Sequence, residues 1–329
     1  MNSQAQTVSS DVIPNQTMRA MVYDDYGDAG VLRPAEVDIP KRLPGQVFIR
    51  VYASSVNPID DRLRNGEMRG LLPGGFPRVP GYDVAGVVVN AAGDTRLQVG
   101  DRVMAFLDHA RGGASAEYAV AAIDVTAKIP DSMSFKTAAA IPLAGTTAIQ
   151  CLRHHGEIEC GDRVLINGAS GGVGMFAVQI AKADGAHVTA VASAANRDFC
   201  LSIGADEFVD YEAYDFTRCD RKWDIILDVA GKASYFDARR VMAKDSRYVT
   251  TEPDAKGVMM TLLTWPFSRS GKAMLAKPKA ADLRSLIDLW SQGKLQVAID
   301  SQFALEELTA AHRRVQQGVD HGKVVVVVA

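Results

Sequence analysis

Short apolar segments separated by Pro and Gly clusters fill the chain up to about residue 139, and they predict strands at residues 19–23, 46–55, 83–90, 102–106 and 116–120. The turn residues between them recur at irregular intervals, as in the stretch Leu-Pro-Gly-Gly-Phe-Pro. Neighbouring strands joined by such short connections run antiparallel in most cases. This part of the chain is therefore predicted to be an irregular, mostly antiparallel β domain.

The pattern then changes to β-rich apolar segments that are spaced by stretches of helical length. The segments are residues 163–167, 187–192, 208–210, 225–228 and 248–250. Regular alternation of this kind predicts βαβ units, and therefore a parallel sheet.

Two amphipathic helices and one strand are predicted after the parallel-sheet region, at residues 281–292, 305–317 and 323–328. The terminal strand is apolar on both faces, so it needs to be covered inside a sheet. Because the parallel sheet already has its strands, we expect the C-terminus to return to the first domain.

The expected organisation is a discontinuous domain that carries an insert. Residues 1–143 and 277–329 form the discontinuous domain, and residues 144–276 form the parallel-sheet domain. Residues 1–17 are rich in Ser, Gln, Asn and Thr and are interpreted as a flexible tail.

Composition narrows the choice of partners and of compartment. The length of 329 residues favours two domains. With 36 Lys and Arg against 39 Asp and Glu, the net charge of −3 argues against nucleic-acid and membrane partners. The four cysteines form no C-x-x-C pair, so we expect buried free thiols and a cytoplasmic protein. The N-terminal tail is similar to neither a secretory nor a mitochondrial address.

The clearest local motif is a glycine-rich turn between a predicted strand and a predicted helix. The strand at residues 163–167 leads into residues 168–174, Gly-Ala-Ser-Gly-Gly-Val-Gly, and a helix follows from Met175. This order aims a helix N-terminus and open backbone N–H groups at a pyrophosphate. The second strand at residues 187–192 completes the unit that a dinucleotide site requires. The alternative is a packing turn without a ligand.

The end of the second strand favours NADP(H) over NAD(H). An NAD site places Asp or Glu there to bind the ribose 2′-hydroxyl, whereas this chain has Ser193 and then Ala-Ala-Asn-Arg. No acid at these positions repels a 2′-phosphate, and Ser193 and Arg197 can bind one. The alternative for Arg197 is a solvated cation on the following helix.

Several motifs resemble the medium-chain dehydrogenase/reductase superfamily along residues 18–328. They are the glycine-rich turn, Asn-Pro-Ile-Asp from Asn57, Val-Pro-Gly-Tyr-Asp-Val-Ala-Gly from Val79, Val-Gly-Asp-Arg-Val from Val99, and Gly-Thr-Thr-Ala from Gly145. Within the superfamily they are similar to the zinc-free quinone oxidoreductase branch. The resemblance implies an α/β fold with two domains, a GroES-like, mostly β catalytic domain and a Rossmann domain with a doubly wound parallel sheet.

The positions that bind catalytic zinc in the alcohol dehydrogenases of this superfamily match Asn57, Tyr82 and approximately Leu143. None of these residue types is a competent zinc ligand, so no metal is expected. Without a Lewis acid, an unactivated alcohol is hard to deprotonate. The expected acceptor is therefore already electrophilic, either a quinone or an alkene conjugated to a carbonyl.

The resemblance implies hydride transfer from NADPH, with Asn57, Asp60, Arg62 and Tyr82 as candidate catalytic residues. Arg62 is similar to a lysine of plant enone and alkenal reductases, and its alternative is a solvated side chain. Asn57 could instead only form a turn before Pro58. The residues expected to bind the cofactor, with Thr147 near the nicotinamide, are Thr147, Gly168, Ala169, Ser170, Gly171, Gly172, Val173, Gly174, Ser193, Asn196, Arg197, Tyr211, Val229 and Lys323.

Two other functions remain open at this point. An enoyl-thioester reductase would use the same chemistry on an acyl thioester, and a non-catalytic NADPH-binding protein would serve a structural or regulatory role. The resemblance also implies a homodimer that pairs through an edge of the cofactor-domain sheet.

Overall fold

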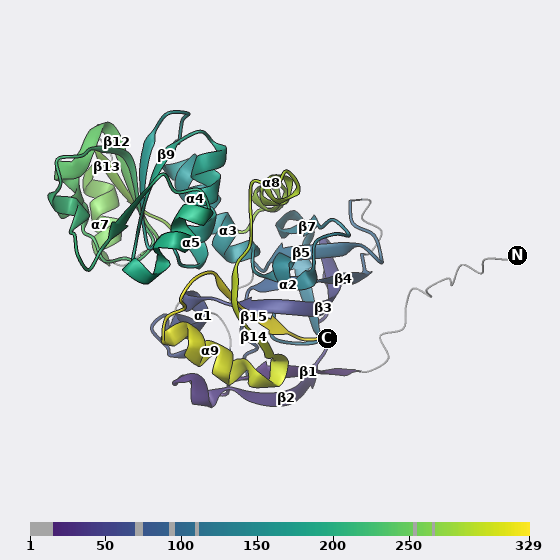
Figure 1. Cartoon of the computed structure of the whole chain (residues 1–329). Coiled ribbons are helices and arrows are strands. Elements are labelled where there is room, and N and C mark those ends of the chain that lie inside the picture. The colour runs from purple at the N-terminus through teal and green to yellow at the C-terminus, as the bar shows by residue number, and fades with distance from the viewer. Residues whose placement is uncertain (1–15, 70–74, 92–95, 109–111, 253–254, 265–266) are drawn as a thin grey trace, which may run out of the picture.

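Two sheets organise the protein in the computed structural model, which describes residues 16–69, 75–91, 96–108, 112–252, 255–264 and 267–329. One sheet is parallel and comes from a continuous stretch of the chain. The other is mostly antiparallel and contains strands from both ends of the chain, so that C-terminal elements lie beside N-terminal ones in Figure 1. The predicted α/β class, with one mostly β domain and one parallel-sheet domain, is confirmed.

The β domain is built on the seven-stranded sheet. Its strands pair antiparallel except for the parallel pair β14–β15, and β6 pairs with β3 beside the main order. Across the sheet the strands are β14 (Ile299–Ala304), β15 (Lys323–Val327), β3 (Gln46–Val56), β4 (Asp83–Asn90), β5 (Arg102–Phe106) and β7 (Thr126–Lys128), with β6 (Tyr118–Ala122) off this path. A separate antiparallel pair is formed by β1 (Thr17–Val22) and β2 (Arg33–Asp38).

Short helices cover the β domain. They are α1 (Pro58–Arg64), α2 (Phe135–Ala139) and α9 (Leu308–Gln316), together with single turns η1 (Ala29–Val31), η2 (Ile123–Val125) and η7 (Leu305–Glu307). Helix α9 packs on α1, where the Gln316 side-chain amide donates to Asp61 Oδ1 at 2.6 Å. The C-terminal part of the chain therefore supports the helix that follows Asn57.

The parallel-sheet domain has six strands. In order across the sheet they are β10 (Glu207–Asp210), β9 (His187–Ala192), β8 (Arg163–Asn167), β11 (Trp223–Asp228), β12 (Met242–Thr250) and β13 (Ser270–Ala273). The strand that leads into the glycine-rich turn, β8, lies at the centre of the sheet, next to β11. The helical elements between residues 142 and 264 are α3 (Pro142–Ile149), η3 (Gln150–His155), α4 (Gly172–Ala183), η4 (Ala194–Asn196), α5 (Arg197–Ser202), η5 (Phe216–Arg218), α6 (Tyr235–Ala238), η6 (Arg239–Val241) and α7 (Ala255–Thr264). Helix α8 (Ala280–Ser291) follows the sheet and packs on α3 and on β7 of the β domain.

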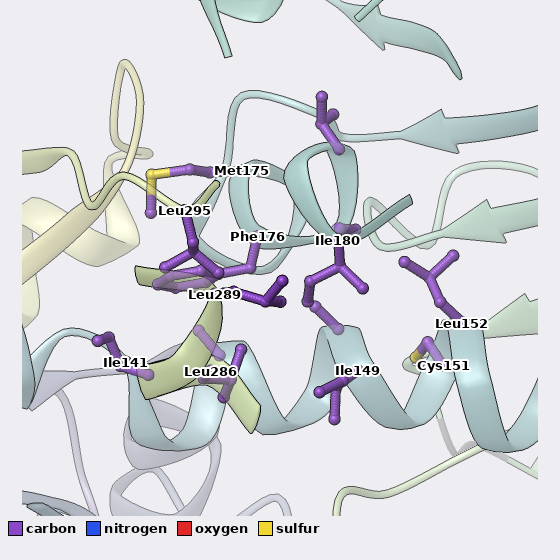
Figure 2. Close-up of a cluster of buried hydrophobic side chains, with 14 of the residues drawn as sticks. Ile141, Ile149, Cys151, Leu152, Met175, Phe176, Ile180, Leu286, Leu289 and Leu295 are labelled. Carbon is purple, nitrogen blue, oxygen red and sulfur yellow. The ribbon is translucent and has the colours of Figure 1, made fainter. Parts of the chain in front are cut away.

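One hydrophobic core spans both domains. Ala53 and Ala85 of the mostly antiparallel sheet belong to the same buried cluster as Val164 and Ile166 of β8. Helix α3 lies at the centre of this cluster and packs on both α4 and α8. Figure 2 labels ten buried side chains of this region: Ile141, Ile149, Cys151, Leu152, Met175, Phe176, Ile180, Leu286, Leu289 and Leu295. Because the core is continuous, the two domains are packed against each other rather than linked by a free hinge.

Several details differ from the sequence-based expectations. Thr17 begins β1, and residues 1–15 of the predicted tail lie outside the described residues. The helix predicted at residues 305–317 begins as the single turn η7 and becomes α-helical only at Leu308. Cys160 is exposed and Cys219 is half-buried, so the expectation of buried thiols is wrong for these two, although it holds for Cys151 and Cys200. The exact domain boundaries stay a prediction.

Candidate active site

The glycine-rich turn joins β8 to α4, and backbone conformation or close packing disfavours a side chain at three of its glycines. Gly168 has a φ of +86°, which favours glycine. A Cβ atom at Gly174 would lie 2.1 Å from the Gly168 carbonyl oxygen, and one at Gly172 would lie 2.8 Å from Lys323 Cδ. The first intrahelical bond of α4 runs from Met175 N–H to Gly171 O at 2.8 Å.

The N–H groups that precede this bond have no partner within the helix, as at any helix N-terminus. They come from Gly172, Val173 and Gly174, and a Cβ at Gly171 would have only Gly168 O nearby, at 3.5 Å. An open backbone that presents N–H groups at a helix N-terminus fits a pyrophosphate.

The residues predicted to hold the adenosine end gather after β9 and β10. The Asn196 amide donates to Ser193 Oγ at 3.1 Å, and Tyr211 N–H donates to the Ala192 carbonyl at 3.2 Å. The exposed Arg197 guanidinium lies 5.6 Å from the Phe208 ring centroid, beside the same strand ends. The predicted polar groups therefore lie at the carboxyl edge of the parallel sheet, where α/β proteins bind their ligands.

The loop after β11 lies beside the glycine-rich turn and is held by Asp228. This buried carboxylate accepts hydrogen bonds from Asn167 Nδ2 at 2.8 Å, from Gly231 N–H at 3.0 Å and from Ala233 N–H at 3.0 Å. Val229 leads into this loop, so the network fixes the backbone around a predicted cofactor-binding residue.

A buried polar cluster lies where the β domain meets this edge. Asp83, the first residue of β4, is fully buried and accepts hydrogen bonds from Ser55 Oγ at 2.5 Å and from Asn57 Nδ2 at 2.8 Å. Its other oxygen accepts from Leu143 N–H at 2.7 Å. The Lys323 ammonium lies 3.7 Å from Asp83 and donates to Asn57 Oδ1. We call these residues, together with Asp60, the buried cluster.

Asp60 is the member of the buried cluster that has spare hydrogen-bonding capacity. Its Oδ2 accepts from Asn57 N–H at 2.8 Å, which caps α1, while its Oδ1 is buried and has no protein partner. Burial, with a contribution from the charge of Asp83, raises the pKa of Asp60 to about 7. A carboxyl group with this pKa can hold or release a proton near neutral pH.

Lys323 connects the buried cluster to the glycine-rich turn. Its side chain packs on Gly172, and the preceding Gly322 N–H donates to Ser170 O at 3.0 Å. Its ammonium is directed at Asn57 and Asp83, and burial lowers the pKa of Lys323 while both carboxylates of the cluster oppose this change. Direct contact between its ammonium and the cofactor stays a prediction.

The remaining candidates lie around the buried cluster. Burial, and next the charge of Asp60, raises the pKa of Tyr82 above its ordinary value. Thr147 is buried on α3 and donates to the Leu143 carbonyl at 2.7 Å. Arg62 does not stand alone, because its Nη2 donates to Glu252 Oε2 at 2.5 Å. The structure thus brings Asn57 into direct contact with both Asp60 and Lys323. The Ser193–Arg197 group lies apart from them, after β9.

Sequence reasoning did not select Ser55, Asp83 or Glu252 as site residues. A signal existed for Asp83, because an acid that begins an apolar strand must find donors when it is buried. Ser55 and Glu252 carry no such signal, since each depends on a partner that is distant in the sequence.

The residues at the positions of a catalytic zinc are already engaged within the protein. Asn57 uses its amide nitrogen on Asp83 and its amide oxygen on Lys323, and Leu143 has no ligating side-chain atom. No group of three His, Cys, Asp or Glu side chains suited to a metal ion occurs within the described residues. None of the helices described is long and apolar enough to span a membrane.

Two family models match the chain. Residues 43–131 match the alcohol dehydrogenase GroES-like domain, and residues 203–326 match the domain described as zinc-binding dehydrogenase. The first match lies within the β domain, whereas the second begins in the parallel-sheet domain and continues through β14, α9 and most of β15 of the β domain.

Similar proteins cover nearly the whole chain. A chloroplastic quinone-oxidoreductase homolog of Spinacia oleracea is 35% identical across 94% of this chain and 98% of that protein. A chloroplastic NADPH-dependent alkenal/one oxidoreductase of Arabidopsis thaliana is 29% identical across 98% of this chain and 83% of that protein. The solved quinone oxidoreductase of Coxiella burnetii is 30% identical, with a TM-score of 0.85 across 95% of this chain and 100% of that one. The chain therefore belongs to the medium-chain dehydrogenase/reductase family, and it is a quinone oxidoreductase-like member of that family.

Proposed function

We propose that the protein is an NADPH-dependent reductase that transfers a hydride to a quinone or to an α,β-unsaturated carbonyl without a metal ion. The observation that carries this proposal is the contact between the glycine-rich turn and the buried cluster, through Gly322 to Ser170 and through Lys323 to Gly172. This contact puts groups suited to a dinucleotide next to a carboxyl group suited to proton transfer. The printed names of the relatives support the same class of acceptor.

Each part of the site has a separate role in this proposal. Bound NADPH would supply the hydride. The N-terminus of α4 holds the pyrophosphate, Thr147 lies toward the nicotinamide, and Ser193 and Arg197 bind the 2′-phosphate. Tyr211 borders the adenosine end of NADPH, and Val229 borders its nicotinamide end.

Reduction of a conjugated carbonyl or a quinone leaves negative charge on oxygen, which needs a donor and then a proton. Asp60 can supply the proton because its pKa of about 7 keeps a large fraction protonated at neutral pH. Asn57, Asp83 and Lys323 position Asp60 by holding the cap of α1. Arg62, on the same helix, is the candidate donor to the oxygen, because only part of its guanidinium is occupied by Glu252.

A metal is not required for this chemistry, because the acceptor is already electrophilic. The engaged Asn57 amide, Tyr82 and Leu143 offer no ligand set for zinc, which supports a metal-free reaction. Location in the cytoplasm stays a prediction, and the plant relatives named above are chloroplastic.

We also propose that the protein is a homodimer that pairs along β13. This strand is the last in the parallel sheet, and α7 packs against it. Large exposed side chains occur on and near α7, namely Met259, Leu262, Leu263 and Phe267. An edge strand beside exposed apolar side chains favours pairing with a second copy.

The first prediction concerns turnover. We expect the protein to oxidise NADPH in the presence of 1,4-naphthoquinone or 3-penten-2-one, and NADH much more slowly, as followed by absorbance at 340 nm. An enoyl thioester is expected to be a poor acceptor. Tight NADPH binding without oxidation by any acceptor would instead indicate the non-catalytic binding protein.

The second prediction concerns cofactor preference. Arg197→Ala should raise KM for NADPH roughly tenfold, because a charge-assisted contact to phosphate is lost, and should leave KM for NADH unchanged. Arg96→Ala, which removes an exposed cation of the β domain, is the control and should change neither value. Equal changes for NADPH and NADH in Arg197→Ala would contradict a contact with the 2′-phosphate.

The third prediction concerns the pKa of Asp60. The folded state raises this pKa from 3.8 to about 7, so ionising Asp60 costs more in the folded protein than in the unfolded chain. The wild-type free energy of unfolding is therefore unaffected by Asp60 below about pH 4, falls as pH rises from about 4 to 7, and stays at the lower value above pH 7. Asp60→Asn avoids this loss. Its free energy of unfolding in urea, relative to wild type, should therefore rise by about 2–3 kcal/mol from pH 5 to pH 8. Asp124→Asn, which changes an exposed acid, should show no such trend.

The fourth prediction concerns assembly. Leu262→Glu places a charge on the exposed face beside β13 and should convert a dimer into a monomer in light scattering coupled to size exclusion. Leu43→Glu, at a leucine of similar exposure in the β domain, should remain dimeric. A monomeric wild-type protein, or a dimer that survives Leu262→Glu, would contradict pairing along β13.

A further inference from the structure

An ion pair connects the two domains at the edge where the proposed cofactor and acceptor would lie. Arg62 Nη2 and Glu252 Oε2 are 2.5 Å apart, although the residues are 190 positions apart in the chain. Both side chains are partly exposed, at 38% and 35%. A pair with this exposure contributes little to stability, so its charges matter mainly for what approaches them.

Glu252 lies directly over the loop that follows β11. It comes two residues after the end of β12, and a Cβ atom at Gly231 would lie 2.6 Å from Glu252 Cγ. Gly231 is in turn fixed by its N–H bond to Asp228, two residues after Val229. The carboxylate of Glu252 is therefore held beside the backbone that is proposed to border the nicotinamide.

Arg62 reaches the same place from the β domain. It lies on α1, two residues after Asp60, and the buried cluster fixes the first turn of this helix. The pair thus connects the helix that carries the proposed proton donor to the loop proposed to border the cofactor. An acceptor that receives both a hydride and a proton must lie close to both elements.

The local charge around Arg62 is negative rather than positive. Besides Glu252, the carboxylate of Glu67 lies 3.7 Å from Arg62 Nε. The formal charges of one guanidinium and two carboxylates add up to −1. An unpaired arginine would bind a carboxylate, sulfonate or phosphate on an acceptor, often through two parallel hydrogen bonds, whereas this arrangement repels such groups.

We propose that Glu252 is a specificity-determining residue that restricts the reductase to uncharged acceptors, because it pairs with one nitrogen of the Arg62 guanidinium and adds a negative charge beside the proposed acceptor site. This inference rests on the proposed function. It specifies the substrate class as neutral quinones and neutral conjugated carbonyls, and it disfavours acyl thioesters that carry phosphates.

The test compares kcat/KM for two quinones that differ in charge, 1,2-naphthoquinone-4-sulfonate and 1,4-naphthoquinone, with NADPH held at saturation. The informative quantity is the ratio of the anionic to the neutral value, because the intrinsic reactivity of each quinone cancels when variants are compared. Glu252→Gln changes the formal sum around Arg62 from −1 to 0, and the ratio should rise roughly tenfold.

Two further variants separate charge from structure. Arg62→Gln leaves a sum of −2, so its ratio should fall below that of wild type. The double variant Arg62→Gln/Glu252→Gln returns the sum to −1 and should have the wild-type ratio. Loss of a merely structural contact would move both single variants in the same direction, since each breaks the same ion pair.

Glu157→Gln is the matched control. Glu157 forms an ion pair at 2.9 Å with Arg247, a residue of β12. This variant therefore removes one negative charge from a Glu–Arg pair that lies away from the carboxyl edge of the sheet. Its ratio should equal that of wild type. If the anionic-to-neutral ratio of Glu252→Gln lies within twofold of the wild-type ratio, the inference is overturned. If the wild-type protein reduces neither quinone, the proposed function itself is overturned.

Discussion

The buried carboxylate of Asp83 is the constraint on which the arrangement of the site depends. A carboxylate with no exposure to water is stable only if donors surround it. Here the donors come from β3, from the residue that precedes α1, from the first turn of α3 and from the start of β15. Ser55 and Asn57 are two residues apart, whereas Leu143 and Lys323 come from distant parts of the chain, so satisfying one acid fixes the relative positions of these three segments. Asn57, at the centre of this arrangement, then fixes Asp60 through the cap of α1.

The parts of the fold that could be predicted from sequence are those that a local pattern determines. The strand at residues 83–90 and the β8, glycine-rich turn and α4 unit were predictable because apolar runs and glycine spacing are local signals. Apolarity on both faces predicted that the strand from Lys323 is covered inside a sheet of the first domain, and it does pair there with β3 and β14. Strands β2 and β14 were missed because exposed and half-buried positions dominate them, so their alternation is weak.

The candidate site was predictable in its residue types and less so in their contacts. Asn57 and Asp60 were selected by a motif, yet the motif does not reveal that Asp60 keeps an unpartnered oxygen. Lys323 was selected as a cofactor residue, whereas its ammonium is directed into the buried cluster. The sequence did not reveal that Arg62 pairs with Glu252, because nothing in the sequence around Glu252 indicates that its carboxylate lies next to Arg62. Long-range pairing of this kind depends on how two domains pack, which a single sequence does not encode locally.

The pairing of β15 with β3 also has a consequence for the order in which the chain acquires its structure. All six strands of the parallel-sheet domain lie between residues 163 and 273, so this domain is complete in sequence before β14 and β15 leave the ribosome. During that interval the edge of β3 that β15 will occupy remains open, and Asp83 lacks its lysine. The domain that begins the chain is therefore the last to be finished, and its unpaired edge is the segment most in need of protection during synthesis.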